Sequence, residues 1–445
     1  MPMRLHKLLV LFSFLLAMLF FTSCGATGIG TIPSGTPDQG NGTPAVISTS
    51  SPSSQPVLTA PPTALGASYA FVRKNQLWVA LNNAKPVQIT HFDYTNLPDA
   101  FWHQPLWSPD DHFIAFIMNA RPAGQGGGGC PAPDYGANGA LYLLNTTTMQ
   151  LTQLVVSADS SDPVAKSALN GYWQYAFWED PTHLLAWYNG ITGKTSNTAG
   201  LYRFDLSSQR LTQVIPLSAL GMATLFNAQK NVPLLLSMRY SNGQLYYLVI
   251  SHPFEQQSQF AIYRHSIVQP ALPGNKVMVI GSEPWCNLQQ SGPFIIPGWD
   301  VLPDGEQLVA QMVSATGTNQ ALGSIQALNL KDGSTTTLFT QASPQMLTHD
   351  LTLAWGPDSK AVVATEDHLL SQDGPYSATL ANPPAMQRYT PNLAGQVAWK
   401  ADSSDFVLQD TEMADAAYES SLYIFHMGDT HGQLLLTDAR DFEWG

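Results

Sequence analysis

The residues that usually carry chemistry form no recognisable catalytic motif in this sequence. Its eleven histidines include no His-Glu-x-x-His motif and no tight pair, and its three cysteines form no Cys-x-x-Cys motif. The familiar zinc-binding patterns are therefore absent. The Gly-x-Ser-x-Gly motif of serine nucleophiles is absent as well. We assign no catalytic residue, no metal site and no cofactor from the sequence.

Two other patterns have both a chemical and a structural interpretation. Gly126 to Gly129 could cradle a phosphate, but the Lys and Ser/Thr of a P-loop do not follow them. The acidic residues Asp110, Asp304 and Asp358 could bind calcium, but no spaced set of oxygen ligands accompanies them. We interpret the glycine run as a loop and the acidic residues as turn formers.

Cysteine chemistry remains open at two positions. Cys130 and Cys286 both lie in segments that we expect to be loops on the same face of the folded domain. A disulfide between them is permitted outside the cytoplasm. The spacing of the two residues does not distinguish such a bridge from two free thiols.

The third cysteine follows a segment typical of exported proteins. Arg4 and Lys7 precede an apolar run from Leu8 to Phe21, which matches a signal peptide and is short for a membrane-spanning helix. The run ends in Phe21-Thr22-Ser23-Cys24-Gly25. Small residues before a cysteine resemble the lipobox of bacterial lipoproteins, in which the cysteine is acylated and becomes the new N-terminus. This resemblance implies a signal peptide over residues 1–23, a lipid on Cys24 and an extracytoplasmic location on the cell membrane. A cleaved signal without lipid and an uncleaved anchor are the alternatives.

A polar spacer follows Cys24. Residues 24–66 consist mainly of Thr, Ser, Pro, Gly and other small residues, with Asp38 as the only charged one. Such a segment cannot bury enough apolar surface to offset the entropy lost on ordering. We expect a disordered tether.

Residues 67–445 are predicted to form a single all-β domain. They are rich in aromatic and β-branched residues, punctuated by Gly and Pro, without helical periodicity or an internal linker. The whole chain has a formal net charge of −13 and no basic patch. Nucleic acid is therefore not an expected partner.

A repeated unit carries the strongest signal for the fold. Each copy has an apolar anchor residue, a turn containing Pro, Asp, Ser or Gly, and an apolar strand. The anchors are Trp107, Trp178, Phe226, Val301, Trp355 and Trp399. Pro fixes φ in the turn and the small polar residues suit it, so each copy predicts a β-hairpin. A second hairpin follows each copy, as in residues 140–145 and 150–154. Four antiparallel strands per repeat are typical of a propeller blade.

The units resemble the TolB-type propeller repeat, which is related to the propellers of prolyl-oligopeptidase enzymes. Trp107 to Phe116 match that repeat best, and Trp355 to Ala364 and Val301 to Ala310 match it in part. The resemblance covers nearly all of the chain after Tyr69 and implies a propeller without the hydrolase domain of those peptidases. It does not specify a function, because the fold serves many unrelated ones.

Seven blades are expected, closed by the C-terminal strand. The strands predicted between Tyr69 and Thr90 lack an inner strand, and Trp444-Gly445 looks like the beginning of one more unit. Pairing the two segments would close the ring and cover the open sheet edge. The irregular stretch from Gly221 to Trp299 leaves six or eight blades as alternatives.

Aromatic residues in or beside the predicted long loops are candidates for a binding face. Those loops span residues 119–139, 157–171, 189–200 and 281–297, and the aromatics are Trp102, Tyr135, Tyr172, Trp173, Trp285 and Trp299. Exposed aromatics favour contacts with proteins or sugars. Burial in the core is the alternative for each of them.

Two functions are consistent with this sequence. The first is a non-catalytic envelope lipoprotein that binds or scaffolds a protein partner. The second is an extracytoplasmic hydrolase or lyase, or a sugar- or peptide-binding protein, that uses the central channel. The first hypothesis is favoured by the missing catalytic motifs and by the tether. A cluster of His and carboxylates in the channel would favour the second, and an apolar or merely polar channel the first.

Overall fold

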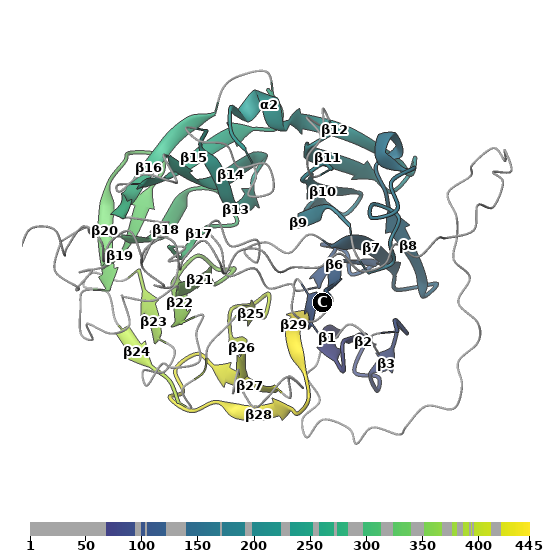
Figure 1. The fold of residues 1–445 in the computed structure, drawn as a ribbon. Coiled ribbons are helices and arrows are strands. Elements are labelled where there is room, and N and C mark those ends of the chain that lie inside the picture. The colour runs from purple at the N-terminus through teal and green to yellow at the C-terminus, as the bar shows by residue number, and fades with distance from the viewer. Residues whose placement is uncertain are drawn as a thin grey trace, which may run out of the picture. The chain divides into compact units, whose positions relative to one another are not determined.

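The computed structural model describes the part of the chain that forms the propeller. The described residues are 68–93, 99–102, 105–121, 139–169, 171–191, 198–223, 232–251, 258–270, 274–283, 297–312, 324–339, 351–366, 376–380, 386–390, 393, 396–410 and 420–445. The segments predicted as signal peptide, Cys24 and tether lie outside them. The described strands form seven antiparallel sheets arranged in a ring, which confirms the predicted seven-bladed propeller (Figure 1).

Each blade is a meander of antiparallel strands. Blade A contains β29 (Arg440–Trp444), β1 (Tyr69–Arg73), β2 (Gln76–Ala80) and β3 (Val87–Gln88); blade B contains β4 (Asp99–Trp102), β5 (Leu106–Trp107), β6 (Phe113–Arg121), β7 (Ala140–Asn145) and β8 (Gln150–Leu154); blade C contains β9 (Trp173–Asp180), β10 (His183–Tyr188), β11 (Gly200–Asp205) and β12 (Arg210–Pro216). Blade D contains β13 (Leu234–Ser241), β14 (Gln244–Ser251), β15 (Ser258–Ser266) and β16 (Asn275–Glu283); blade E contains β17 (Trp299–Val301), β18 (Gln307–Met312), β19 (Ser324–Asn329) and β20 (Thr335–Phe339). Blade F contains β21 (Leu351–Trp355), β22 (Ala361–Glu366), β23 (Tyr376–Thr379) and β24 (Met386–Arg388); blade G contains β25 (Val397–Trp399), β26 (Asp405–Asp410), β27 (Ser421–His426) and β28 (Gln433–Leu436). The described helices are one 3-10 turn, η1 (Ser157–Asp159), and one short helix, α2 (Leu217–Leu220).

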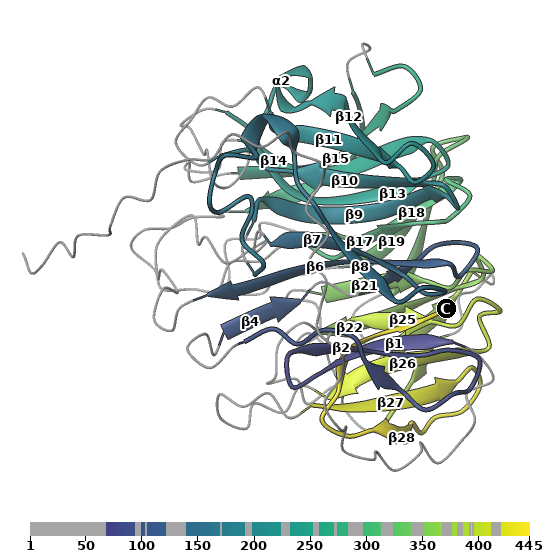
Figure 2. The same ribbon diagram turned by 90° about the vertical axis from the view of Figure 1, so that its right-hand side faces the viewer.

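The repeated turns join the first and second strands of their blades, as predicted. In each of four repeated units, the residue after the recurring Asp adopts positive φ. These residues are Asp111 (59°), Gly305 (72°), Ser359 (64°) and Ser403 (57°). This requirement explains why Asp, Gly and Ser occupy the position, since bulkier residues adopt positive φ at a higher cost. In blade B the turn is also held by its own side chains, because Ser108 Oγ donates to Asp110 Oδ1 over 2.6 Å. Figure 2 shows the ring edge-on, with the short turns gathered along one face.

Blade D differs from the prediction in the position of its repeat. Phe226 lies outside the described residues, and the inner hairpin of blade D turns at Asn242 and Gly243. Both residues have positive φ, 45° and 73°, which is the requirement of a tight two-residue hairpin turn. The anchor proposed at Phe226 is therefore wrong.

Ring closure occurs as the sequence predicted. Strand β29 pairs with β1, with Tyr69 opposite Trp444 and Ala70 opposite Glu443, so the C-terminal strand is the inner strand of blade A. Phe442 and Trp444 are buried against Tyr69 and Phe71 and against strands of blade G. The ring therefore closes within one sheet built from both ends of the described chain.

The core lies between the blades. Buried side chains form seven hydrophobic clusters, most of which join residues of neighbouring sheets. Two anchor tryptophans also donate across a blade boundary: Trp178 Nε1 donates to Leu106 O over 2.9 Å, and Trp399 Nε1 donates to Ala354 O over 3.3 Å. In both cases the acceptor directly precedes the anchor of the preceding blade, so the same bond recurs with the repeat.

Candidate functional site

Burial alternates along the inner strands, because successive side chains of a strand point to opposite sides. Ala176, Met238, Leu353 and Phe442 are buried between blades, whereas their neighbours on both sides are only partly buried. The partly buried set comprises Tyr175, Phe177, Ser237, Arg239, Asp300, Thr352, Ala354, Asp441 and Glu443. Tyr175, Phe177 and Ala354 of this set pack against core clusters. We call the nine residues the inner-strand positions.

An ion pair joins three blades at these positions. Arg239 Nε of β13 lies 3.3 Å from Asp300 Oδ1 of β17, and Asp300 Oδ2 accepts a hydrogen bond of 2.9 Å from the backbone N–H of Trp355 in β21. The Arg239 guanidinium also lies over the ring of Trp299, 5.5 Å from its centroid. Burial raises the pKa of Asp300, although the charge of Arg239 acts in the opposite direction. Both carboxylate oxygens of Asp300 thus hold blades together.

A second buried carboxylate lies on the ring-closing strand. The side chain of Asp441 is 14 % exposed and its Oδ2 lies 3.6 Å from Arg440 Nε. The backbone N–H of Asp441 donates to Gln409 Oε1 of blade G over 3.2 Å. Its φ is +50°, at an irregularity in the pairing between β29 and β1. Burial raises the pKa of this carboxyl group, with Arg440 opposing the shift. Asp441 therefore has a strained backbone conformation and a carboxyl group whose ionised form is destabilised by burial.

A cavity of about 120 Å³ opens beside the channel where the inner strand of blade B is interrupted. Strands β4 and β5 both pair with β6, but the pairing jumps from Trp102 opposite Met118 to Leu106 opposite Ala115. Pro105 directly precedes β5 and has no N–H to continue a ladder. The cavity is lined by Leu106, Phe116, Ile117, Gln174, Tyr175, Ala176 and Gln396.

A buried chain of hydrogen bonds leads to this cavity. Trp187 Nε1 donates to Asn189 Oδ1 (2.7 Å), and Asn189 Nδ2 donates to Gln174 Oε1 (3.0 Å). Gln174 Nε2 then donates to the hydroxyl of Tyr175 (3.1 Å), which in turn donates to Leu236 O of blade D (2.7 Å). Burial raises the pKa of Tyr175 above its ordinary range, so the phenol stays protonated. The chain fixes Gln174 and Tyr175 at the cavity wall.

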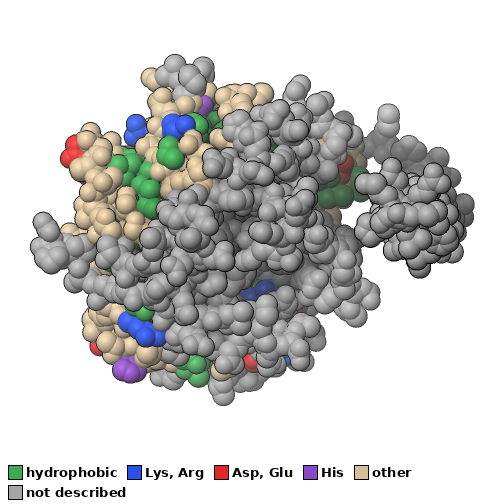
Figure 3. Space-filling model, turned by 60° about the vertical axis from the view of Figure 1, so that its left-hand side comes forward, with side chains coloured by type: hydrophobic (Ala, Val, Ile, Leu, Met, Phe, Trp, Pro, Cys, Tyr) green, Lys and Arg blue, Asp and Glu red, His purple; other side chains and the backbone are tan. Residues whose placement is uncertain are grey.

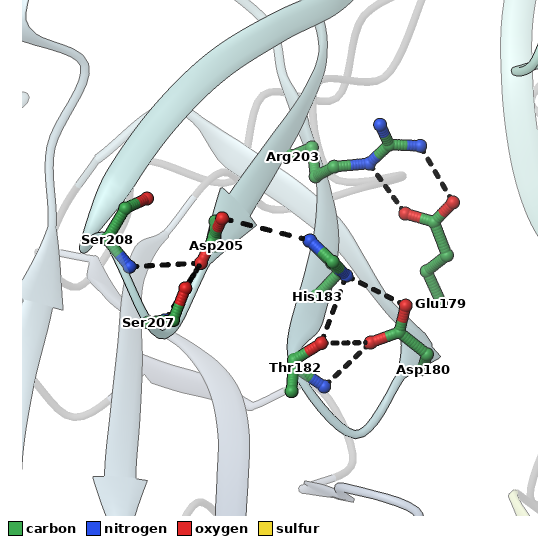
Figure 4. Close-up of polar contacts among 8 residues, drawn as sticks. All are labelled: Glu179, Asp180, Thr182, His183, Arg203, Asp205, Ser207 and Ser208. Atoms are coloured by element: carbon green, nitrogen blue, oxygen red, sulfur yellow. Dashed lines mark hydrogen bonds and ion pairs between the residues drawn. The ribbon is translucent and has the colours of Figure 1, made fainter.

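Some polar groups on the short-turn face are paired within their own blade, whereas others join neighbouring blades, as Ser241 Oγ of blade D does by donating to Leu302 O of blade E. In blade C, His183 Nδ1 lies 2.7 Å from Asp180 Oδ2, and His183 Nε2 lies 3.9 Å from Asp205 Oδ2 (Figure 4). Hydrogen bonds from Ser207 and Ser208 lower the pKa of Asp205 to about 2. Burial opposes ionisation of Asp180, but hydrogen bonds from Thr182 and His183 outweigh it and lower that pKa to about 2 as well. These contacts stabilise two adjacent turns of one sheet.

Arg203 and Glu179 extend the same pattern. Arg203 Nε and Nη2 donate to the two oxygens of Glu179 over 2.6 and 2.7 Å, a bidentate pair between strands of blade C (Figure 4). Blade G contains a comparable pair, in which His426 contacts Asp405 across its two hairpins. The pairs of Arg203 with Glu179 and of His426 with Asp405 each lie within one sheet and reinforce it.

The outer edge of blade D is the longest in the ring. Strand β16 spans Asn275–Glu283, whereas the outer strands of the other blades span at most the seven residues of β12. In the described sheet β16 is terminal and pairs with β15 alone. Val279 on this edge is 43 % exposed, and Val268 in the preceding turn is 77 % exposed. Figure 3 shows hydrophobic side chains next to Lys and Arg side chains on the described surface of this side of the molecule.

Three of the six predicted binding-face aromatics belong to the core. Tyr172, Trp173 and Trp299 are 8 %, 2 % and 2 % exposed. Trp173 packs edge-on against Tyr188, with ring centroids 5.0 Å apart, and its Nε1 donates to Leu154 O of blade B. Trp299 donates to Ser237 Oγ of blade D over 2.7 Å. The core interpretation fits these three, because a ring at the start of an inner strand is covered by the neighbouring blade.

The other predicted site residues are outside the description. Tyr135, Trp285, Cys130 and Cys286 lie outside the described residues, as does Cys24. Trp102 belongs to β4, of which the backbone alone is described. The disulfide and the lipidation therefore stay predictions. Sequence reasoning missed Arg239, Asp300 and Asp441, and the one available signal was the position of Asp300 just before the predicted turn that contains Asp304.

The described ranges contain neither a metal-binding cluster nor a membrane-spanning helix. They contain no group of three His, Cys, Asp or Glu side chains placed to hold a metal ion. No helix within the same ranges has the length and apolar character needed to cross a membrane.

Comparisons with known proteins identified similar solved structures at low sequence identity. A structure of prolyl endopeptidases aligns with a TM-score of 0.50 and 10% identity over 86% of this chain and 50% of that chain. TolB from Acinetobacter baumannii aligns with a TM-score of 0.38 and 13% identity over 87% of this chain and 68% of that one. An oligogalacturonate lyase from Vibrio parahaemolyticus aligns with a TM-score of 0.44 and 14% identity over 84% and 86%. No family model and no curated protein matches the sequence.

The seven sheets define the described chain as a seven-bladed β-propeller, and the fold likeness to the prolyl endopeptidase structure agrees with this. The chain spans half the length of the prolyl endopeptidase that it resembles. At these identities the likeness concerns the fold alone, so the function has to be argued from the residues of this chain.

Proposed function

We propose that the protein is a lipid-anchored, extracytoplasmic binding module whose propeller holds a protein partner and catalyses no reaction. The observation that carries the proposal is the outer edge of β16, nine residues long, with the exposed Val279 on it and the exposed Val268 in the turn before it. An unpaired edge offers main-chain N–H and C=O groups to an extended segment of another protein. The exposed valines add apolar contacts beside it.

The edge also has features that limit unspecific pairing. The pairing between β15 and β16 is irregular at two places, and Lys276 is exposed near the beginning of β16. Bulges and lysines are common protections of natural sheet edges. A partner segment therefore has to match the local shape and charge, which favours a specific interaction.

The charged groups at the inner-strand positions support a non-catalytic role. A catalytic acid, base or nucleophile must be free to exchange a proton with its substrate or attack it. Asp300 uses both oxygens to hold blades D, E and F together, and Asp441 is next to Arg440. We therefore assign these charged groups to holding the ring together and not to catalysis.

Site-specific photo-crosslinking tests the partner surface. A photoreactive residue at Val279 of the full chain should yield one discrete crosslinked protein in the native membrane. The matched control is Thr212, which is exposed on β12, the outer strand of blade C. Val279→Lys should abolish co-purification of the same protein. Equal products at both positions, or none at either, would contradict the proposed surface.

The anchor is tested separately. Cys24→Ser should move the protein from the membrane fraction to the soluble fraction and abolish incorporation of labelled fatty acid, because the thiol is the proposed attachment point. A Cys130→Ser variant is the matched control and should stay in the membrane fraction. Membrane retention of Cys24→Ser would contradict lipid anchoring.

An enzyme that acts in the channel is the second candidate. The raised pKa values of Asp300 and Asp441 favour it, because perturbed carboxyl groups cluster at catalytic sites. Activity screens with glycosides and peptides decide between the two functions. Turnover that is lost in Asp441→Asn and retained in Asp205→Asn would support an enzyme, and no turnover would support the binding module.

A further inference from the structure

The cavity beside the channel has one apolar and one polar side. The apolar residues of its lining are Leu106, Phe116, Ile117 and Ala176, and of these Phe116 and Ile117 are each 1 % exposed. The amides of Gln174 and Gln396 and the hydroxyl of Tyr175 form the polar side. Apart from the neutral phenol of Tyr175, no ionisable side chain of the described chain lines the cavity.

Gln174 is held in a fixed orientation. Gln174 is 4 % exposed. Its Oε1 accepts one hydrogen bond from Asn189, and its Nε2 donates one to the hydroxyl of Tyr175. A glutamine amide has two N–H donors and two acceptor lone pairs. One donor and one lone pair of Gln174, which is among the lining residues of the cavity, therefore have no partner among the described residues. A supporting shell of this kind is what a precise binding group requires.

Gln396 completes the polar side from a different blade. It directly precedes β25 of blade G, is exposed, and has no hydrogen-bond partner among the described residues. Gln174 comes from blade C. Two amides from separate blades, each able to donate and accept, thus border one apolar cavity that opens toward the channel.

We propose that this cavity is a binding site for a small uncharged compound with an aliphatic body and a carboxamide-like head. The body fits the wall formed by Leu106, Phe116 and Ile117, and the head pairs with the amides of Gln174 and Gln396. A charged head is disfavoured, because the cavity offers no opposite charge to offset its desolvation. This site is independent of the edge of β16.

The volume sets the size of the ligand. An engineered apolar cavity of about 150 Å³ holds benzene. A cavity of about 120 Å³ is therefore suited to a compound of about six non-hydrogen atoms or fewer. Isobutyramide meets this limit and has both the branched apolar body and the carboxamide. Isobutyrate has the same shape with a charged head and serves as the matched ligand.

Ligand-observed NMR with the full chain in detergent tests the site. Isobutyramide should show saturation transfer from the protein, and isobutyrate should show none. Gln396→Leu should weaken isobutyramide binding by about 3- to 10-fold, the effect of one lost hydrogen bond. Ala176→Leu should abolish binding by filling the cavity. Gln433→Leu, at an exposed position of β28, should leave binding unchanged.

Three outcomes would overturn the proposal: isobutyrate binding as well as isobutyramide, an unchanged affinity in Gln396→Leu, or equal losses in Gln396→Leu and Gln433→Leu. Because Ala176 is buried, Ala176→Leu needs a melting curve to confirm that it folds. If it does not fold, Gln396→Leu decides alone, since its side chain is exposed and holds no other group in place.

Discussion

The carboxylates of the short-turn face and those of the channel experience opposite environments. Asp180 and Asp205 lie at turns and have pKa values lowered to about 2. Asp300 and Asp441 lie on inner strands, and burial raises their pKa values. In the turns, hydroxyl and backbone donors a few residues away favour the charged form. In the channel, removal from water disfavours it. The charge of a turn carboxylate therefore adds stability at neutral pH, whereas the charge of a channel carboxylate costs stability relative to the protonated form of the same group.

The largest expected effect is on the channel side, at the ring closure. Deleting residues 437–445 removes β29 and leaves the buried face of β1 and its edge without a partner. We expect loss of cooperative thermal melting, and aggregation through the exposed edge. Trp444→Ala is the milder companion and should fold with a stability loss of about 3–5 kcal/mol. A soluble truncated chain that melts cooperatively would contradict this account of closure.

The next effect concerns the ion pair that joins three blades. Asp300→Ala removes the partner of Arg239 and the acceptor for the Trp355 N–H. We expect a loss of about 1–3 kcal/mol in the free energy of unfolding, measured by urea denaturation. Asp300→Asn keeps an acceptor for Trp355 and should lose less. Equal losses in the two variants would show that the inter-blade hydrogen bond contributes little.

A smaller effect, a gain in the free energy of unfolding, is expected on substitution of Asp441. Its raised pKa means that the folded state favours the protonated form, so its stabilising contribution at low pH is lost as pH rises through the folded-state pKa. Asp441→Asn removes this cost, and asparagine tolerates the positive φ. We expect a gain of about 1 kcal/mol or less at pH 7, which shrinks as the pH falls toward 4. Melting curves across this range measure it, and a loss at pH 7 would refute it.

The smallest effect is expected at Asp205, where substitution should lower the stability at pH 7. A lowered pKa contributes stability that is present above the ordinary range of Asp and is lost as pH falls toward 2. Asp205→Asn should melt slightly below the wild type at pH 7 and coincide with it near pH 2. The same gain at pH 7 in Asp205→Asn and Asp441→Asn would remove the distinction between the two regions.

The same contrast explains what could be predicted from the sequence. The turns at Asp110, Asp304 and Asp358 were predictable, because a turn depends on residues that are adjacent in the chain. The Arg239–Asp300 pair joins residues far apart in the sequence, and only the ring brings them together. Ring closure was predictable because the strands predicted for the first blade did not include an inner strand, and the C-terminal residues matched the beginning of one.

The two inaccurate expectations have physical causes. The anchor placed at Phe226 followed an apolar run, whereas the stronger local signal was Asn242-Gly243, a pair suited to a tight hairpin turn. Trp173 and Trp299 were candidates for a binding face because they adjoin predicted loops. Burial by a neighbouring blade is a property of the assembled ring, and loop position does not reveal it.

The pairing within blade A has a mechanical consequence. The described propeller begins at Ser68, and β1 lies between β29 and β2, with hydrogen-bonded neighbours on both sides. A pull on the chain at Ser68 acts along β1 and loads both ladders in shear, so their bonds must yield together and not one after another. The strand that closes the circle thereby also makes the entry point of the chain resistant to tension.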